Sequence, residues 1–153
     1  MNLKIVILFI LSLCIIIFLI LGLGHAPQPY VLISDRNGEK CTINLIIAET
    51  PDEMRYGLMN EKDLPEDTGM LFIFEKPGKY AFWMKNTLIP LDMIFISQDL
   101  QIVDIKKNLA PNSEEIITSD EISAYLIEVN GGYCDRNHVT IDDTISLHLG
   151  EAY

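Results

Sequence analysis

Residues 82–92 read FWMKNTLIPLD and contain Trp83, the single tryptophan of the chain. β-rich stretches at Tyr80–Met84 and Leu91–Ile96 flank the polar segment Lys85-Asn86-Thr87. Polar side chains between two apolar strands are typical of a binding site on a β scaffold. They are equally typical of a tight structural turn. The stretch therefore predicts a β fold with either a site or a structural corner near its centre.

The rest of the globular part alternates short apolar runs with turn sequences. Asn37-Gly38 lies between two β-branched runs and predicts a hairpin, because both residues tolerate a positive φ. Thr50-Pro51-Asp52-Glu53 predicts the capped start of one short helix, which Gly57 can end. Gly131–Asn137 is expected to form a helical turn. The whole pattern predicts a mainly β protein, a compact β-sandwich or barrel of about seven to nine short strands with one or two short helices.

The N-terminal segment is strongly apolar. Residues 5–24 carry no charge and would span roughly 30 Å as a helix, which is about the hydrocarbon thickness of a bilayer. They form either an uncleaved transmembrane anchor or a signal peptide cleaved after Ala26. Lys4 on the short N-terminal side orients the following domain outward. We therefore expect a membrane-anchored extracytoplasmic domain, or a secreted or periplasmic one if the segment is cleaved.

These features divide the chain into residues 1–26 (transmembrane anchor or signal), 27–40 (linker and first hairpin) and 41–153 (β domain). All 22 acidic residues, and every basic residue except Lys4, lie after Ala26. A surface this acidic repels nucleic acid and anionic lipid headgroups. The expected partners are the membrane through residues 5–24 and a small polar ligand or an envelope protein, and nucleic acid is excluded.

Four blocks of sequence resemble a known family in their order and spacing. They are Arg55 with Gly57-Leu58-Met59, Gly69-Met70-Leu71-Phe72, Phe82–Thr87 with Pro90-Leu91-Asp92, and Glu128–Gly132. The chain resembles the prokaryotic domain of unknown function 192 (DUF192) family from about Thr42 to Leu147. The resemblance implies an exported, mostly β barrel or sandwich, and it carries no biochemical activity. Gly131 and Asp142 depart from the family pattern, and both lie in expected turns.

Eight residues form the predicted ligand-binding site: Arg55, Trp83, Lys85, Asn86, Thr87, Asp92, Glu128 and Asn130. In a binding site, Trp83 supplies an aromatic floor, Asn86 and Asp92 supply directional polar groups, and Arg55 anchors an anion. Such a set suits a small polar ligand, a sugar or a peptide end. In the structural alternative, Asn86 and Thr87 cap a turn and Arg55 pairs with Asp92.

Catalysis has weaker support. Asp92 and Glu128 would have to act as an acid/base pair in a hydrolase of envelope carbohydrate or peptide. The chain has neither a Gly-x-Ser-x-Gly elbow nor a His-Glu-x-x-His motif. The sequence therefore favours a binding or envelope accessory module, with the hydrolase and a purely structural partner of a membrane protein as alternatives. No catalytic residue and no cofactor is predicted.

Sulfur-bearing side chains leave two questions open. Five methionines of the globular part could favour copper(I), but each lies in an apolar run, so we interpret them as core residues and predict no metal site. Cys41 and Cys134 could form a disulfide in an oxidising compartment, closing a long loop. Two separate buried thiols are the alternative.

Overall fold

The computed structural model describes residues 28–150, which contain nine strands and two helices. In chain order these are β1 (Tyr30–Asp35), β2 (Gly38–Ala48), α2 (Pro51–Tyr56), β3 (Thr68–Gly78), β4 (Ala81–Phe82), β5 (Leu91–Ile96), β6 (Ile102–Leu109), β7 (Ile117–Thr118), β8 (Ser123–Asn130), α3 (Tyr133–Arg136) and β9 (Thr144–His148). The predicted mainly β class is thereby confirmed, and so are the number of strands and the two short helices.

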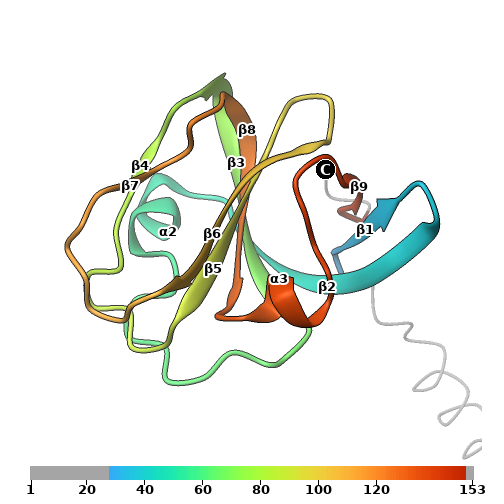
Figure 1. Cartoon of the computed structure of the whole chain (residues 1–153). Helices are drawn as coiled ribbons and strands as arrows, with labels where there is room; N and C mark the ends of the chain where they lie inside the picture. The colour runs from blue at the N-terminus through green and yellow to red at the C-terminus, as the bar shows by residue number, and fades with distance from the viewer. Residues whose placement is uncertain (1–27, 151–153) are drawn as a thin grey trace, which may run out of the picture.

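Seven of these strands form one strongly curled sheet in the order β6-β5-β8-β3-β2-β1-β9 (Figure 1). Only β2 and β3 pair in parallel, and α2 lies in the crossover between them. The curl brings β9 back to the start of β6, where Gln101 bridges Thr144 and the amide of Ile102 donates to the carbonyl of Asp143 over 2.8 Å. The architecture is therefore a half-barrel made of one sheet, with β4 and β7 as a separate two-stranded piece.

The predicted hairpin joins β1 to β2, but its turn differs in detail from the expectation. Arg36 and Asn37 occupy the turn, and of the two residues expected at positive φ only Gly38 has one, at +134°. The Asn37 amide donates to Oδ1 of Asp35 over 2.6 Å, so a side-chain acceptor helps to hold the turn. The hairpin is confirmed, and the positive φ at Asn37 is not found.

The strand expected at Tyr80–Met84 is shorter than predicted. β4 covers only Ala81–Phe82, because a turn follows in which the Thr87 amide donates to the Met84 carbonyl over 3.0 Å. β4 pairs with β7, which lies in the mostly polar segment between β6 and β8. Ile117 of β7 is buried, and this burial explains why a strand forms there.

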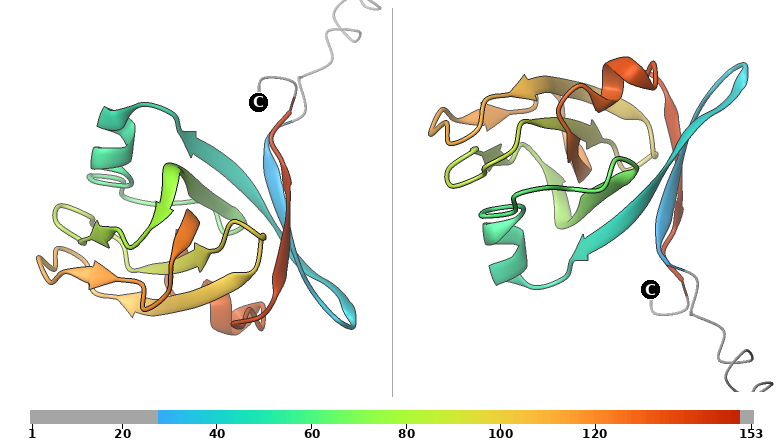
Figure 2. Two further views of the ribbon diagram at one scale, coloured as in Figure 1. Left: turned by 90° about the horizontal axis from the view of Figure 1, so that it is seen from above. Right: turned by 90° about the horizontal axis from the view of Figure 1, so that it is seen from below.

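Two hydrophobic cores lie on opposite faces of the sheet. The inner core receives residues from all seven strands of the curl, for example Ile33, Ile127 and Ile145. The outer core receives Phe72 and Leu126 from the middle of the sheet and is covered by α2, the loop that follows it, and β7. Figures 1 and 2 show α2 and β4 on one side of the molecule and β1 and β9 on the other. β3, β5 and β8 serve both cores and are the common wall of the fold.

The predicted anchor or signal segment lies outside the described residues. Between residues 28 and 150, no helix has the length and apolar character needed to cross a membrane.

Candidate functional site

Helix α2 forms where the sequence predicts it and borders the largest concentration of candidate residues. The Thr50 hydroxyl accepts from the Glu53 amide over 3.2 Å, and Glu53 Oε2 accepts from the Thr50 amide over 2.8 Å, which completes a capping box. Gly57 ends the helix at φ +51°. These caps fix a helix of only six residues, whose last turn carries Arg55 and Tyr56 to the edge of a cavity.

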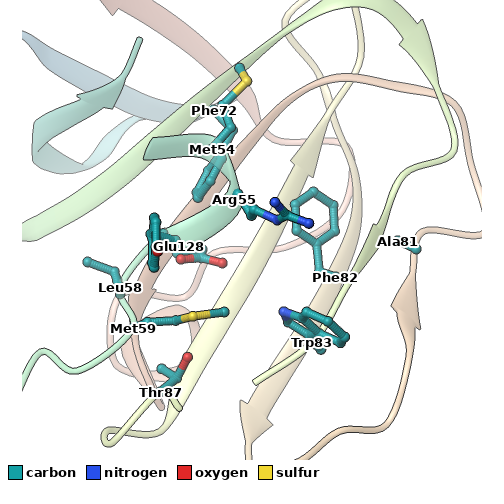
Figure 3. Close-up of a pocket in the computed structure, with 12 residues that line it drawn as sticks. Met54, Arg55, Leu58, Met59, Phe72, Ala81, Phe82, Trp83, Thr87 and Glu128 are labelled. Atoms are coloured by element: carbon teal, nitrogen blue, oxygen red, sulfur yellow. The ribbon is translucent and has the colours of Figure 1, made fainter. Parts of the chain in front are cut away.

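The cavity measures about 200 Å³ and lies between α2, β4 and the outer face of β3 and β8. Figure 3 shows its walls. The lining residues are Met54, Arg55, Tyr56, Gly57, Leu58, Met59, Phe72, Ala81, Phe82, Trp83, Thr87 and Glu128. Four of the eight predicted site residues therefore meet here, namely Arg55, Trp83, Thr87 and Glu128.

Glu128 provides the deepest polar group of the cavity. Side chains of β8 alternate between the two faces of the sheet, so Ile127 and Val129 enter the inner core while Leu126 and Glu128 face the outer side. Glu128 is only 6% exposed, and its carboxyl points into the cavity (Figure 3). Within residues 28–150, this carboxyl has no hydrogen bond or ion pair. Burial raises its pKa to about 8.

Apolar neighbours and one glycine create this environment. Met70 on β3 and Met93 on β5 lie directly across the strands from Glu128. A Cβ at Gly57 would lie 3.4 Å from Oε2 of Glu128 and 3.3 Å from Cζ of Phe72, so the helix end approaches the carboxyl closely only because residue 57 has no side chain. The carboxyl is consequently buried among these neighbours and faces the cavity.

The remaining polar groups of the cavity come from its rim. Arg55 is exposed and, within the described part of the chain, has no ion pair. Trp83 is 43% exposed, and Figure 3 shows its indole nitrogen on the edge of the ring nearest Met59 and Glu128. Thr87 is buried at the base. A guanidinium, an indole N–H and a hydroxyl thus surround the space into which the Glu128 carboxyl opens.

Asp92 does not belong to this site. Its Oδ1 accepts from the amides of Asn108 (2.8 Å) and Gly132 (3.0 Å), and its Oδ2 accepts from the amide of Cys134 (2.9 Å). The side chain is fully buried. It ties β5 to the end of β6 and to the N-terminus of α3, so its role is structural.

Two expectations for Asp92 are therefore wrong. No ion pair forms between Arg55 and Asp92, because the carboxylate is saturated by backbone amides on the other side of the sheet. The proposed acid/base pair also fails: the ladder between β5 and β8 pairs Asp92 with Val129 and Met93 with Glu128. Neighbours in a ladder share a face, so the two carboxyls lie on opposite faces of the sheet.

The other three predicted residues lie outside the cavity lining and hold loops together. Lys85 pairs with Glu114 over 3.2 Å, and its Nζ lies 5.4 Å from the Trp83 ring centroid. Asn86 occupies the turn at φ +57°, which backbone hydrogen bonds close in place of the expected side-chain bonds. The Asn130 amide nitrogen donates to the carbonyls of Leu64 (2.8 Å) and Pro65 (3.2 Å).

Cys41 and Cys134 are free thiols in the structure, so the disulfide is not formed there. Cys134 is fully buried in the inner core. Burial, reinforced by the charge of Asp92, raises the pKa of its thiol well above the ordinary value. Cys134 is therefore an inert core residue in the native protein.

Eight cavity residues were not predicted from the sequence. Met54, Tyr56 and Phe82 adjoin predicted site residues, so proximity in the sequence was a usable signal for them. Phe72 and Ala81 carried no such signal, because only the sheet register and the β4–β7 pairing bring them to the cavity. Between residues 28 and 150, no group of three or more His, Cys, Asp or Glu side chains could hold a metal ion.

Comparisons with known proteins agree with this fold. The model of the DUF192 family, described as "Uncharacterized ACR", matches residues 32–147. No curated protein matches the chain. A solved structure from Sinorhizobium meliloti 1021, described as a "putative transcription regulator", is similar with a TM-score of 0.75 and 35% identity, and the match covers 80% of this chain and 95% of that one.

A second similar structure is that of a protein of unknown function from Novosphingobium aromaticivorans DSM 12444. Its TM-score is 0.73 at 30% identity, and the match covers 76% of this chain and 83% of that chain. The shared part therefore includes nearly the whole described fold.

Proposed function

The chain belongs to the DUF192 family, and we propose that it is a binding module whose cavity between α2 and β4 takes a small polar ligand. One observation carries this proposal: a carboxyl that is more than nine-tenths buried opens, without a protein partner in the described chain, into a cavity rimmed by Arg55 and Trp83. Buried polar groups normally have a partner, and a ligand can supply one here.

In this function the uncharged run at residues 5–24 tethers the domain outside the cytoplasm, which the length of the run and the position of Lys4 support. Binding does not require a catalytic pair, and the opposite orientations of Asp92 and Glu128 argue against hydrolysis by these two groups. Transcriptional regulation, the role in the description of the S. meliloti protein, fits poorly with 22 acidic and 11 basic residues if it requires contact with DNA.

The single tryptophan makes a direct test practical. The full chain in detergent micelles would be titrated with amino acids, short peptides, organic acids, amines and sugars while the Trp83 emission is followed. A ligand that enters the cavity changes the surroundings of Trp83, so we expect a saturable emission change for at least one class of ligand.

Two variants with an enlarged side chain localise the signal. Met59→Phe narrows the cavity, because the Met59 side chain extends across it toward Trp83 (Figure 3), whereas Leu88→Phe enlarges an exposed side chain outside the cavity lining. We expect binding to be lost in the first variant and kept in the second. A panel without any saturable ligand would overturn the proposed function, as would a ligand whose affinity is the same in both variants.

A further inference from the structure

The polar side chains of the cavity share one chemical property, the ability to donate a hydrogen bond. Arg55 and the Trp83 indole can only donate, and the Thr87 hydroxyl can donate as well as accept. Glu128, with its pKa near 8, is predominantly a neutral acid at neutral pH and carries an O–H donor. Four donors of this kind call for a ligand rich in acceptors.

The charges of the residues that line the cavity likewise favour a ligand rich in acceptors. Besides Glu128, the titratable residues that line the cavity are Arg55 and Tyr56. The cross-strand neighbours of Glu128 on β3 and β5 are the uncharged Met70 and Met93, and β4 contributes only Ala81 and Phe82. While Glu128 is neutral, the lining therefore carries the single positive charge of Arg55.

On the basis of the proposed binding function, we propose that the ligand is a carboxylate, held between Arg55 and Glu128, with an apolar tail against Trp83 and Tyr56. Arg55 matches a carboxylate because a guanidinium presents parallel N–H donors. Tyr56 and Trp83 are 61% and 43% exposed and both line the cavity, so they offer apolar surface at its mouth. The carboxylate can belong to a free organic acid or to the C-terminus of a peptide.

An organic amine is the competing ligand, and the geometry disfavours it. To attract an ammonium group, Glu128 would have to ionise in a position where it is only 6% exposed. The ammonium group would then share a cavity of about 200 Å³ with the positive charge of Arg55. A carboxylate meets neither obstacle.

The experiment compares three ligands that differ only in the head group: 3-phenylpropionate, 3-phenylpropionamide and 3-phenylpropylamine. Binding to the full chain is followed by Trp83 emission at about pH 6, where Glu128 is neutral. We expect the carboxylate to bind at least about tenfold more tightly than the amide and the amine. Affinities within a factor of about two, or a preference for the amine, would overturn the carboxylate assignment and leave ligand binding itself intact.

A second arm distinguishes the two sources of the carboxylate. An N-acetylated tripeptide that ends in phenylalanine is tested with a free C-terminus and as its C-terminal amide. A free-acid peptide that binds more tightly than 3-phenylpropionate identifies a chain terminus as the ligand. Binding of 3-phenylpropionate alone identifies a small organic acid. Both results support the carboxylate proposal, whereas equal binding of the free and amidated peptides contradicts it.

Arg55 and Lys85 form a matched pair for testing the role of charge, since only Arg55 lines the cavity. Arg55→Gln is expected to weaken 3-phenylpropionate binding about tenfold or more, with part of the affinity restored in Arg55→Lys. Lys85→Gln removes a positive charge that lies beside the Trp83 ring but outside the cavity lining. It should leave the affinity within about twofold. Equal losses in Arg55→Gln and Lys85→Gln would show a nonspecific charge effect and would overturn the site.

Glu128 is tested by pH. As pH rises above about 8, Glu128 ionises and opposes the ligand, so the affinity of the wild type for 3-phenylpropionate should fall about tenfold per pH unit. Glu128→Gln keeps a hydrogen-bond donor without a titratable proton, so it should bind the carboxylate with little pH dependence between about pH 6 and 9. A wild-type affinity that does not change with pH across this range would show that Glu128 does not contact the ligand.

Discussion

At the scale of single residues, Glu128 affects stability through the same burial that makes it a hydrogen-bond donor. Its carboxyl has a pKa of about 8, against an ordinary value of 4.5, because the folded state surrounds it with apolar side chains. Between these two values the folded protein holds a proton that the unfolded chain has released. Stability must therefore fall as pH rises from about 4.5 to about 8, and the full penalty is present above pH 8.

We predict that the free energy of unfolding of the wild type decreases across this window by an amount on the order of 3–5 kcal/mol attributable to Glu128. Glu128→Gln removes the titration and should flatten the profile. The measurement is urea unfolding of the full chain in micelles, followed by Trp83 emission at several pH values. Glu115→Gln, at an exposed position, is the control and should keep the wild-type slope. A wild-type profile that is flat from pH 5 to 8 would contradict the raised pKa.

Other titrating groups act outside this window. The pKa of Asp104 is lowered: burial raises it, but the Asp120 amide and Lys106 together lower it by more. Its stabilising contribution is present above its unfolded pKa and is lost on acidification. The pKa of Lys106 is raised, chiefly by Asp104, so its contribution is lost only at strongly alkaline pH. The region from pH 5 to 8 therefore reports mainly on Glu128.

A second prediction for a single residue concerns Gly57. Its backbone, at φ +51° and ψ −132°, suits glycine, and a Cβ there would press on Phe72 and Glu128. Gly57→Ala should destabilise the protein by about 1–3 kcal/mol and weaken any ligand that reaches Glu128. Urea unfolding and a Trp83 titration measure the two effects.

Gly38→Ala separates backbone strain from filling of the cavity. Gly38 also has a positive φ, at +134°, but no atom lies within 4 Å of the position of its added Cβ. This variant should lose stability and keep wild-type ligand affinity. If Gly57→Ala also kept its affinity, the floor of the cavity would not be at Glu128.

At the scale of secondary-structure elements, Asp92 joins three of them. It is a remote cap for α3, since it accepts from the amides of Gly132 and Cys134 at the start of that helix. α3 has no side-chain cap of its own. Asp92→Asn places an amide N–H₂ where at least one backbone N–H now donates, so we predict a loss of about 2–4 kcal/mol in unfolding free energy.

Thermal melting of Asp92→Asn and of Asp99→Asn, which changes an exposed aspartate in a turn, tests this prediction. Only the first variant should melt at a clearly lower temperature. A folded Asp92→Asn protein should still bind ligand, because Asp92 lies on the opposite face of the sheet from the cavity. Loss of binding without loss of stability would show that Asp92 contributes to ligand binding after all.

Elements whose signals are local could be predicted from the sequence. The capping box at Thr50 and Glu53, the end of α2 at Gly57 and the β1–β2 hairpin each depend on a few neighbouring residues. The short extent of β4 could not be predicted, because the turn from Met84 to Thr87 that ends it is held by a hydrogen bond from the Met84 amide to the carbonyl of the distant Ser113. β7 was missed for the same reason, since its strand pairing is with β4.

At the scale of the whole molecule, the register of the sheet determines which of the predicted site residues lie on the same face. β5 and β8 are apolar on both faces, so no alternation in the sequence showed which way Asp92 and Glu128 point. Only the pairing of Met93 with Glu128 places the two carboxyls on opposite faces. The curl that joins β9 to the start of β6 is equally nonlocal. Half of the eight predicted site residues therefore line the cavity, and the sequence could not separate these four from the structural ones.

The last prediction concerns β3, β5 and β8, the strands that contribute side chains to both cores. Adjacent residues of one strand enter different cores, as Ile127 and Leu126 of β8 do, so neither core can open without disturbing the strands that hold the other. We therefore expect the described domain to unfold as one cooperative unit. Cys134 in the inner core and Glu128 on the outer side report on the two cores independently.

A chain with Cys14→Ala and Cys41→Ala keeps Cys134 as its only thiol, and a thiol reagent can reach this buried group only after opening. At about pH 9, Glu128→Gln relieves the penalty of the ionised carboxyl and should slow labelling of Cys134 on the order of a hundredfold, compared with the same background carrying Glu128. Slower labelling would mean that stabilising the outer side also holds the inner core closed. Labelling at an unchanged rate, despite a higher free energy of global unfolding, would show that the inner core opens by itself. The half-barrel would then consist of two units that share strands without sharing stability.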